Sequence, residues 1–235
     1  MRLLKLLLIF NLGFITTACA EEDEVQPAPA ATLTPTVYYK PVIDHYTSYD
    51  RCAPEEFNPI RNREGEILFS LCEVDRRKCV VQGTCLIQIQ EQEFLLNIDT
   101  KIDGEFRFKI LKNTQCHFGM GVRNICLDPF YSVAADLKFH KPGDVLFIPA
   151  LKGVKLPDET IHDGYVIVRD AGGGIVGEHR FDFFTGYFHY LHRKNPFYSL
   201  GLTNPEKRFQ YEKVDSTLAE EIRKKRAYPK IPKNN

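Results

Sequence analysis

The sequence predicts a mainly β protein, built as a barrel or a sandwich, and two observations favour this fold class. Short runs rich in branched and aromatic residues recur from residue 66 onward, separated by Gly, Pro and Asp-Gly turns. No stretch between residues 66 and 190 keeps the 3.6-residue apolar period of an amphipathic helix. Several short strands divided by turn residues are typical of barrels and sandwiches.

Each expected strand is a short apolar run, and three of them alternate apolar and polar residues as half-buried strands do. The expected strands cover residues 66–71, 84–90, 93–98, 105–110, 144–149 and 164–169. Turn residues such as Asp103-Gly104 and Asp163-Gly164 fall between or next to these runs. No internal repeat is present, so a single β domain is the simplest arrangement.

The N-terminus predicts a signal peptide over residues 1–20. A basic start is followed by the apolar run 6–15 and then by small residues, the order of a cleaved export signal. The run is shorter than the roughly 20 residues that span a membrane. Ala18-Cys19-Ala20 fits ordinary cleavage, whereas Thr16–Cys19 resembles a lipobox that would leave a lipid anchor on Cys19, and both interpretations stay open. The chain is expected to be exported, to the periplasm or cell envelope with or without the anchor, or secreted.

Composition divides the rest of the chain into three parts. Residues 21–37 are rich in Pro, Ala and Thr and predict a linker. Residues 38–195 predict one β domain that begins with an irregular N-terminal wrap over 38–65. Residues 196–235 predict a C-terminal tail with a short helix, which a capping box at Thr217–Glu220 would open and which would end near Arg226.

Charge and cysteine content narrow the function classes. The formal net charge is +0, so no strong field favours nucleic acid as a partner. Six cysteines follow Cys19, and an even number in an exported chain indicates disulfides. We favour the pair Cys116–Cys126, which would close the glycine-containing turn between them. The spacing of Cys and His does not fit a zinc finger, so we expect no metal and no cofactor.

The segment from Asp170 to Gly186 carries the candidate chemistry. Asp170 stands before a run of three glycines, and Asp182 stands between Phe181 and Phe183. A carboxylate among aromatic rings is poorly solvated, which raises its pKa. A carboxylic acid that stays protonated near neutral pH can donate a proton, so Asp182 is a candidate acid catalyst.

Three pieces of sequence, taken together, resemble a known family. They are Ala134-Ala-Asp136 with Pro142-Gly143-Asp144-Val145 and Pro149, then DAGGGIVG (170–177), then RFDFFTG (180–186). In this order they resemble the three-aspartate (3D) domain family, and most of all the catalytic barrel of the MltA-type lytic transglycosylases. The resemblance implies a double-psi β-barrel that cleaves peptidoglycan glycan strands. It also implies that Asp182 is the catalytic acid and that Asp136 and Asp170 line the same groove.

The resemblance implies a reaction that needs only one acid. A lytic transglycosylase cleaves the β-1,4 bond between MurNAc and GlcNAc, and the sugar's own 6-hydroxyl takes the place of water, so one Asp serves as both acid and base. Two alternatives stay open: a lysozyme-like hydrolase that uses Asp182 and a water, and a glycan-binding module without turnover. Any one of the three aspartates alone is more simply a turn residue.

Further residues of the same segments are candidates for substrate binding, on a chain that we expect to be a monomer. Glycines can let the backbone approach a ligand closely, Arg180 could hold a carboxylate, and aromatic rings could stack on sugars. The substrate-binding candidates are Gly172, Gly173, Arg180, Phe184, Thr185 and Tyr187. Core packing is the more natural place for Phe181 and Phe183.

Overall fold

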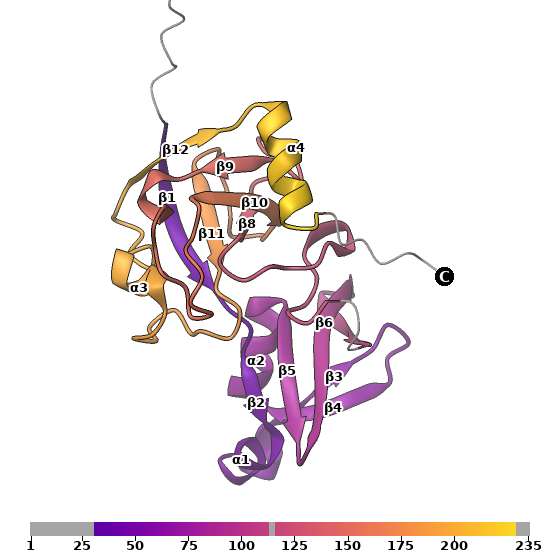
Figure 1. Cartoon of the computed structure of the whole chain (residues 1–235). Helices are drawn as coiled ribbons and strands as arrows, with labels where there is room; N and C mark the ends of the chain where they lie inside the picture. The colour runs from indigo at the N-terminus through magenta and orange to yellow at the C-terminus, as the bar shows by residue number, and fades with distance from the viewer. Residues whose placement is uncertain (1–30, 113–115, 229–235) are drawn as a thin grey trace, which may run out of the picture.

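The computed structural model describes residues 31–112 and 116–228, which fold into a closed barrel and a second, smaller body (Figure 1). Three predicted features lie outside the described residues: the signal peptide, the lipid anchor at Cys19, and residues 21–30 of the linker. Within the part of the chain that the structure describes, no helix is long and apolar enough to cross a membrane.

Six strands close the barrel in the order β1-β11-β8-β10-β9-β12. Their bounds are β1 (Ala31–Tyr38), β8 (Ser132–Ala135), β9 (Val145–Phe147), β10 (Tyr165–Asp170), β11 (Arg180–Phe184) and β12 (Phe209–Lys213). Strand β1 pairs in parallel with β11 and antiparallel with β12, so the two ends of the described chain complete the barrel. Alternate residues of the strands, among them Val168, Phe181 and Phe183, are fully buried in its core.

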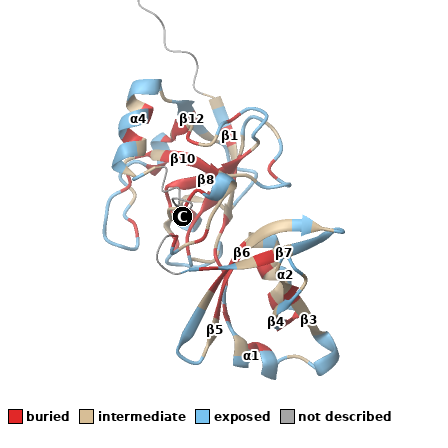
Figure 2. Cartoon of the chain, turned by 90° about the vertical axis from the view of Figure 1, so that its right-hand side faces the viewer, coloured by how far each residue is buried: buried red, intermediate tan, exposed pale blue. Residues whose placement is uncertain are grey.

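The second body occupies the chain between β1 and the barrel's second strand, β8. A four-stranded sheet has the order β2-β5-β6-β7, and a separate hairpin pairs β3 with β4. The bounds are β2 (Val42–Asp44), α1 (His45–Asp50), β3 (Phe57–Arg61), β4 (Ile67–Cys72), α2 (Glu73–Gln82), β5 (Thr84–Ile89), β6 (Gln92–Ile102) and β7 (Glu105–Leu111). Its core, which includes Ile60, Leu96 and Phe108, is separate from that of the barrel, and Figure 2 shows buried segments within each body.

The remaining helices are short and lie on the barrel side of the molecule (Figure 1). They are the α-helices α3 (Pro196–Leu200) and α4 (Ser216–Lys225), and the 3-10 helices η2 (Val122–Asn124) and η3 (Pro149–Leu151); a further 3-10 helix, η1 (Pro54–Glu56), belongs to the second body. The N-cap of α4 is Asp215, whose carboxylate accepts from the N–H groups of Thr217 and Leu218. The sequence pointed to Thr217 for that position, two residues too late.

Every expected strand overlaps an observed one, but the expected boundaries of the β domain were wrong. Strand β1 lies in the segment predicted as a linker, and strand β12 lies in the predicted C-terminal tail. Each of these strands pairs with a strand that is far away in the sequence, β1 with β11 and β12 with β9. A local sequence pattern does not reveal such pairings.

The expectation of an irregular wrap over residues 38–65 was also wrong. This segment supplies β2, α1 and β3 of the second body. Helix α2 was missed as well, because charged residues dominate it and its apolar stripe is weak. Gly83, at φ 74°, ends α2 in the left-handed conformation that favours glycine.

Three disulfides stabilise the fold: Cys52–Cys72, Cys79–Cys85 and Cys116–Cys126. The first two lie within the second body. The third, the pair favoured from the sequence, closes a loop that connects the second body to the barrel.

Candidate active site

A groove runs between the barrel and the second body and contains two of the three predicted aspartates. Its volume is about 560 Å³. The barrel contributes Tyr38, Asp182 and the end of β10 with the glycine run that follows it. The second body contributes the end of α2 and residues of β5, β6 and β7. The groove therefore has one wall from each body.

Asp182 lies in the middle of β11, where it faces Thr36 of β1 and Ala134 of β8 in the strand register. Burial raises the pKa of its carboxyl to about 6, against a smaller opposing effect of the Thr36 hydroxyl and the Arg180 charge. Its Oδ1 atom is buried, on the side of the carboxyl away from solvent. A carboxyl that lines a groove and stays protonated near pH 6 can donate a proton to a ligand.

The phenylalanines beside Asp182 in the sequence do not surround it in space. Successive side chains of a strand point to opposite faces. Phe181 and Phe183 accordingly pack in the barrel core, while Asp182 lies on the groove side. The predicted direction of the pKa shift agrees with the structure, but its cause is burial at the groove and not the neighbouring rings.

Asp170 ends strand β10 and lines the same groove. Both of its carboxylate oxygens are engaged: Oδ2 accepts from the Tyr38 hydroxyl at 3.1 Å, and Oδ1 accepts from the Ala171 N–H at 2.8 Å. Burial raises the pKa of Asp170 to about 7, and the charge of Asp182 adds to the rise.

Asp136 is not among the described residues that line the groove. Its carboxylate accepts from the N–H groups of Gly177 at 2.9 Å and Lys138 at 3.0 Å, and these bonds lower its pKa. His140 contacts the same segment through the carbonyl of Glu178, at 2.7 Å from Nε2. Asp136 thus fastens the far end of the glycine-rich loop, and its charge does not act on Asp182.

The glycine run forms part of the groove wall, as predicted for Gly172 and Gly173. A tight turn, in which the Ile175 N–H donates to the Gly172 carbonyl at 3.0 Å, carries the chain away from Asp170. A Cβ atom added to Gly173 would meet nothing within 4 Å. Open space above this backbone lets a ligand approach it closely.

The other predicted substrate-binding residues lie outside the groove. Arg180 donates to the Thr34 carbonyl at 3.3 Å, and Phe184 is buried with its ring centroid 5.0 Å from that of Tyr38. Thr185 is buried and donates to the Phe188 carbonyl at 2.7 Å. The Tyr187 ring lies over the Lys40 ammonium, 4.1 Å from centroid to nitrogen, and lines a different cavity.

The second body supplies groove residues that the sequence did not identify. Thr84 and Asn97 are nearly buried and bonded to each other, with 2.9 Å between the Thr84 hydroxyl and the Asn97 Oδ1. Phe106 is 38% exposed and offers an aromatic face at the groove. Tyr38 was missed on the barrel side. In the sequence, these residues do not differ from other Thr, Asn, Phe and Tyr residues of the chain, and only the fold brings them to the groove.

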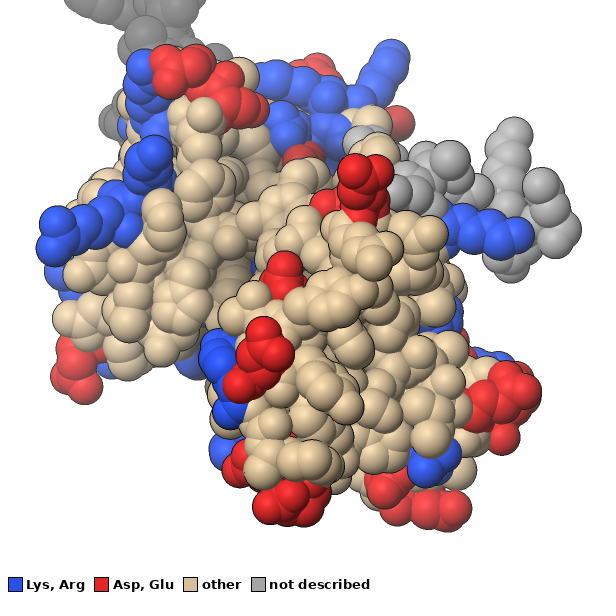
Figure 3. Space-filling model, turned by 90° about the horizontal axis from the view of Figure 1, so that it is seen from below, with Lys and Arg blue, Asp and Glu red and all other residues tan. Residues whose placement is uncertain are grey.

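Most of the surface that faces the viewer from below is uncharged, with acidic and basic side chains scattered over it and along its edge (Figure 3). Within residues 31–112 and 116–228, His, Cys, Asp and Glu form no group of three or more that could hold a metal ion.

Comparison with known proteins assigns one segment to a family. Residues 131–193 match the 3D domain family, so this part of the chain is a 3D domain. The match includes all three aspartates and the glycine run. No match is found among curated proteins.

Solved structures of lytic transglycosylases share the fold. Escherichia coli MltA with bound chitohexaose is 15% identical, with a TM-score of 0.53, over 78% of this chain and 72% of that one. The membrane-bound lytic murein transglycosylase from Agrobacterium tumefaciens is also 15% identical, with a TM-score of 0.51, over 83% of this chain and 77% of that one. The shared region exceeds the 3D domain, so the likeness extends to the second body. The chain has an MltA-like fold, mainly β with a closed six-stranded barrel.

Proposed function

We propose that this chain is a peptidoglycan lytic enzyme that cleaves the β-1,4 bond between MurNAc and GlcNAc by a lytic transglycosylase mechanism, with Asp182 as the general acid and base. The observation that carries the proposal is the state of Asp182. It lines a groove, and burial raises its pKa to about 6.

The first step is proton transfer to the leaving oxygen. The Asp182 carboxyl donates its proton to the glycosidic oxygen, the C1–O bond of MurNAc breaks, and GlcNAc leaves as an alcohol. Positive charge develops on the MurNAc C1 and ring oxygen. Asp182 is now an anion, and its charge stabilises this centre.

The second step returns the proton. The 6-hydroxyl of the same MurNAc attacks C1 and gives its proton to the Asp182 carboxylate. The new C1–O6 bond closes a 1,6-anhydro ring, and the acid is regenerated without water. One carboxyl is therefore sufficient, where a hydrolase needs a second group as base or nucleophile.

Asp170 and Tyr38 set the electrostatics around the acid. Burial and the charges of Asp170 and Asp182 raise the pKa of the Tyr38 hydroxyl. Its hydroxyl therefore stays protonated and donates to Asp170. When Asp170 is ionised, its charge also favours the cationic centre that forms on the sugar.

A glycan suits the other groove wall. This wall presents apolar surface, an amide and a hydroxyl, which are the contacts that an uncharged sugar ring uses. Chitohexaose bound to the E. coli MltA structure is an oligosaccharide on the same fold. We assign Gly172, Gly173, Thr84 and Phe106 to contact with the glycan.

The finer features of the protein follow from this proposal. We expect the barrel to be of the double-psi type and the chain to act as a monomer in the cell envelope or after secretion, without a cofactor. The predicted export signal would bring it to its substrate, with the choice between cleavage and lipidation at Cys19 left open. The Agrobacterium tumefaciens protein that shares this fold is a membrane-bound lytic murein transglycosylase, which is compatible with a place in the cell envelope.

Digestion of purified peptidoglycan, followed by mass spectrometry of the soluble products, tests the function. A transglycosylase releases fragments with 1,6-anhydro-MurNAc ends. Reducing MurNAc ends would show the lysozyme-like alternative, in which a water replaces the 6-hydroxyl. Protein that sediments with peptidoglycan and releases nothing would be a binding module. Either of these results would contradict the proposed mechanism.

A further inference from the structure

The loop closed by the Cys116–Cys126 disulfide is held by buried polar side chains from three different elements. Lys40, just after β1, donates from its ammonium to the His117 carbonyl. Arg169 of β10 donates to the Cys126 carbonyl at 2.9 Å. Asn97 of β6 accepts from the Met120 N–H at 2.8 Å. Lys40 and Arg169 are fully buried, and Asn97 is 7% exposed.

Burial of Lys40 and Arg169 costs solvation free energy, which Arg169 recovers in part through its ion pair with Asp128 at 3.8 Å. Removing an ammonium or a guanidinium from water is costly, and well-packed apolar residues often serve stability equally well. The effect is visible at Lys40, because burial lowers the pKa of its ammonium to about 7. The contacts of these residues fix the loop in space between the two bodies.

Two glycines fit this loop against the walls on either side of it. A Cβ atom on Gly119 would lie 2.8 Å from the Thr84 hydroxyl of the second body. A Cβ atom on Gly121 would overlap the Arg169 carbonyl oxygen and would lie 3.0 Å from the Cβ atom of Asp170. Real Cβ atoms do not approach so closely, so the loop fits between Thr84 and Asp170 only because both positions are glycine.

The backbone of the loop meets the Asp170 side chain directly. The Val122 backbone N–H acts on Asp170 as a hydrogen-bond donor. Gly121 and Val122 also line the groove beside Asp170. The other groups that act on Asp170 are the Tyr38 hydroxyl from β1, the Asp182 carboxylate from β11 and the Ala171 N–H. The loop thus covers one side of Asp170 with backbone and without charge.

We propose that the disulfide-closed loop 116–126 is a positioning element for Asp170, and that Gly121 is the positioning residue through which it acts. The inference rests on the proposed function for its catalytic consequence. The loop keeps Asp170 covered and aligned with Tyr38, and it sets the spacing of the two groove walls at the same point.

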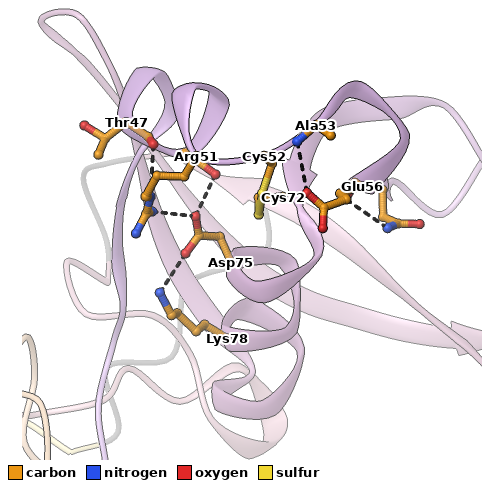
Figure 4. Close-up of a disulfide and its surroundings, with 10 residues drawn as sticks. Thr47, Arg51, Cys52, Ala53, Glu56, Cys72, Asp75 and Lys78 are labelled. Carbon is orange, nitrogen blue, oxygen red and sulfur yellow. Dashed lines mark hydrogen bonds and ion pairs between the residues drawn. A yellow bond between two sulfur atoms is a disulfide. The ribbon is translucent and has the colours of Figure 1, made fainter.

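Gly121→Ala and Cys116→Ser/Cys126→Ser test the proposal in two ways. The first variant keeps the disulfide and forces the loop away from Asp170, while the second removes the closure. Cys52→Ser/Cys72→Ser is the matched control, because it also removes one disulfide. Near this control site, Asp75 of α2 holds α1 independently of the disulfide. It accepts from the Ser48 hydroxyl of α1 at 2.6 Å and pairs with Arg51, just after α1, at 3.0 Å (Figure 4).

The measurement is the pKa of Asp170, from carboxyl carbon NMR shifts with the resonance assigned by Asp170→Asn. When the cover opens, water reaches Asp170 and lowers its pKa, while loss of the Val122 hydrogen bond raises it by less, because burial is the largest effect. We therefore expect the pKa of Asp170 to fall toward the ordinary value in both loop variants, with about a tenfold change in proton affinity. The control should keep the wild-type value. If Gly121→Ala does not fold, the cysteine variant decides alone.

Two results would overturn the proposal: an Asp170 pKa unchanged in the folded loop variants, or one moved equally by the control. Peptidoglycan digestion runs in parallel, and the loop variants should lose kcat with little change in KM. If the wild-type protein digests nothing, the proposed function fails, whereas the titration still decides the role of the loop.

Discussion

The two walls of the groove differ in what they can do. The barrel wall contains both carboxyls with raised pKa values, Asp170 and Asp182, together with the Tyr38 hydroxyl. The wall of the second body has no titratable side chain among its described lining residues; it consists of Val80, Val81, Gln82, Gly83, Thr84, Asn97, Ile98 and Phe106. In the proposed mechanism, the barrel wall transfers the proton and the second body contacts the glycan.

This separation has a kinetic consequence. Groups that act on the bond being broken change kcat, whereas groups that contact the ligand equally in its ground and transition states change KM. Variants of the barrel wall should therefore lower kcat, and variants of the second body should raise KM.

Asp182→Asn should give the largest effect. Asn preserves the size of the side chain but cannot donate a carboxyl proton, so kcat should fall by roughly 10²–10⁴-fold, the usual contribution of general acid catalysis. Release of soluble fragments from peptidoglycan measures it. Asp144→Asn is the matched control, since Asp144 lies on the barrel outside the groove and pairs with Lys213 at 2.7 Å. Equal rates for wild type and Asp182→Asn would break the assignment of chemistry to the barrel wall.

The rate should also fall as the pH rises through about 6. Asp182 must carry its proton to act, and its pKa is raised to about 6 by burial. Ionisation of Asp170, whose pKa is raised to about 7, favours the cationic centre and therefore does not cause this loss. A profile of initial rate between pH 4 and pH 9 measures this limb. A rate that stays flat up to pH 9 would remove the protonated acid from the mechanism.

Asp170→Asn should stabilise the fold at high pH. A carboxyl whose pKa is higher in the folded state favours folding at low pH, and this stabilisation is lost as the pH rises from about 4 through about 7. Removing the charge should therefore increase the free energy of unfolding at pH 8 by about 2–4 kcal/mol, and by little at pH 4. Urea unfolding at both pH values gives the difference.

Asp163→Asn provides a control of opposite sign for this experiment. The ion pair with Lys225, at 2.7 Å, helps to hold the pKa of Asp163 below its usual value despite partial burial. Its contribution to stability is present at pH 8 and is lost as the pH falls, so this variant should be less stable at pH 8. A destabilised Asp170→Asn at pH 8 would contradict the sign derived for the groove.

Phe106→Ala should raise KM and leave kcat nearly unchanged. Losing part of an aromatic contact of this size costs about 1 kcal/mol, which corresponds to roughly a fivefold weaker binding. Ile110→Ala is the matched control, since Ile110 is an exposed residue of the same strand that lines a different cavity. A large loss of kcat in Phe106→Ala would contradict the expectation that the second body contributes to binding and not to the chemical step.

Asp136→Asn should give the smallest effect. Asp136 holds the Gly177 N–H and does not line the groove, so the variant should loosen the glycine-rich loop slightly and leave kcat unchanged. Digestion rates at saturating peptidoglycan measure it. A loss comparable with that of Asp182→Asn would give Asp136 the direct part in catalysis that the family resemblance implies.

The sequence predicted what depends on local pattern and on motif order. Asp170 and Asp182 were found because they belong to ordered motifs, and the Cys116–Cys126 pair because it closes a short loop. Strands β1 and β12 were missed because only the barrel explains them. The sequence also predicted a single β domain, whereas strands β2 to β7 form a second body, because its strands resemble those of a continuous β domain.

The residues that line the groove also depend on contacts between segments that are distant in the sequence. Phe184 shares a face of β11 with Asp182 but is buried against Tyr38 and Ala134, and the turn after β11 takes Tyr187 to a different cavity. Phe106, 76 residues before Asp182, lines the groove because the second body folds back against the barrel. Proximity in sequence therefore did not predict which residues line the groove with Asp182.

The titration of Asp182 in the wild-type protein tests the account most directly. Carboxyl carbon NMR, with the resonance assigned by Asp182→Asn, gives its pKa without reference to any substrate. We expect a value of about 6, well above the ordinary range of an aspartate. A pKa near 4 would mean that the carboxyl is charged at neutral pH, and Asp182 would then not be the proton donor of this groove.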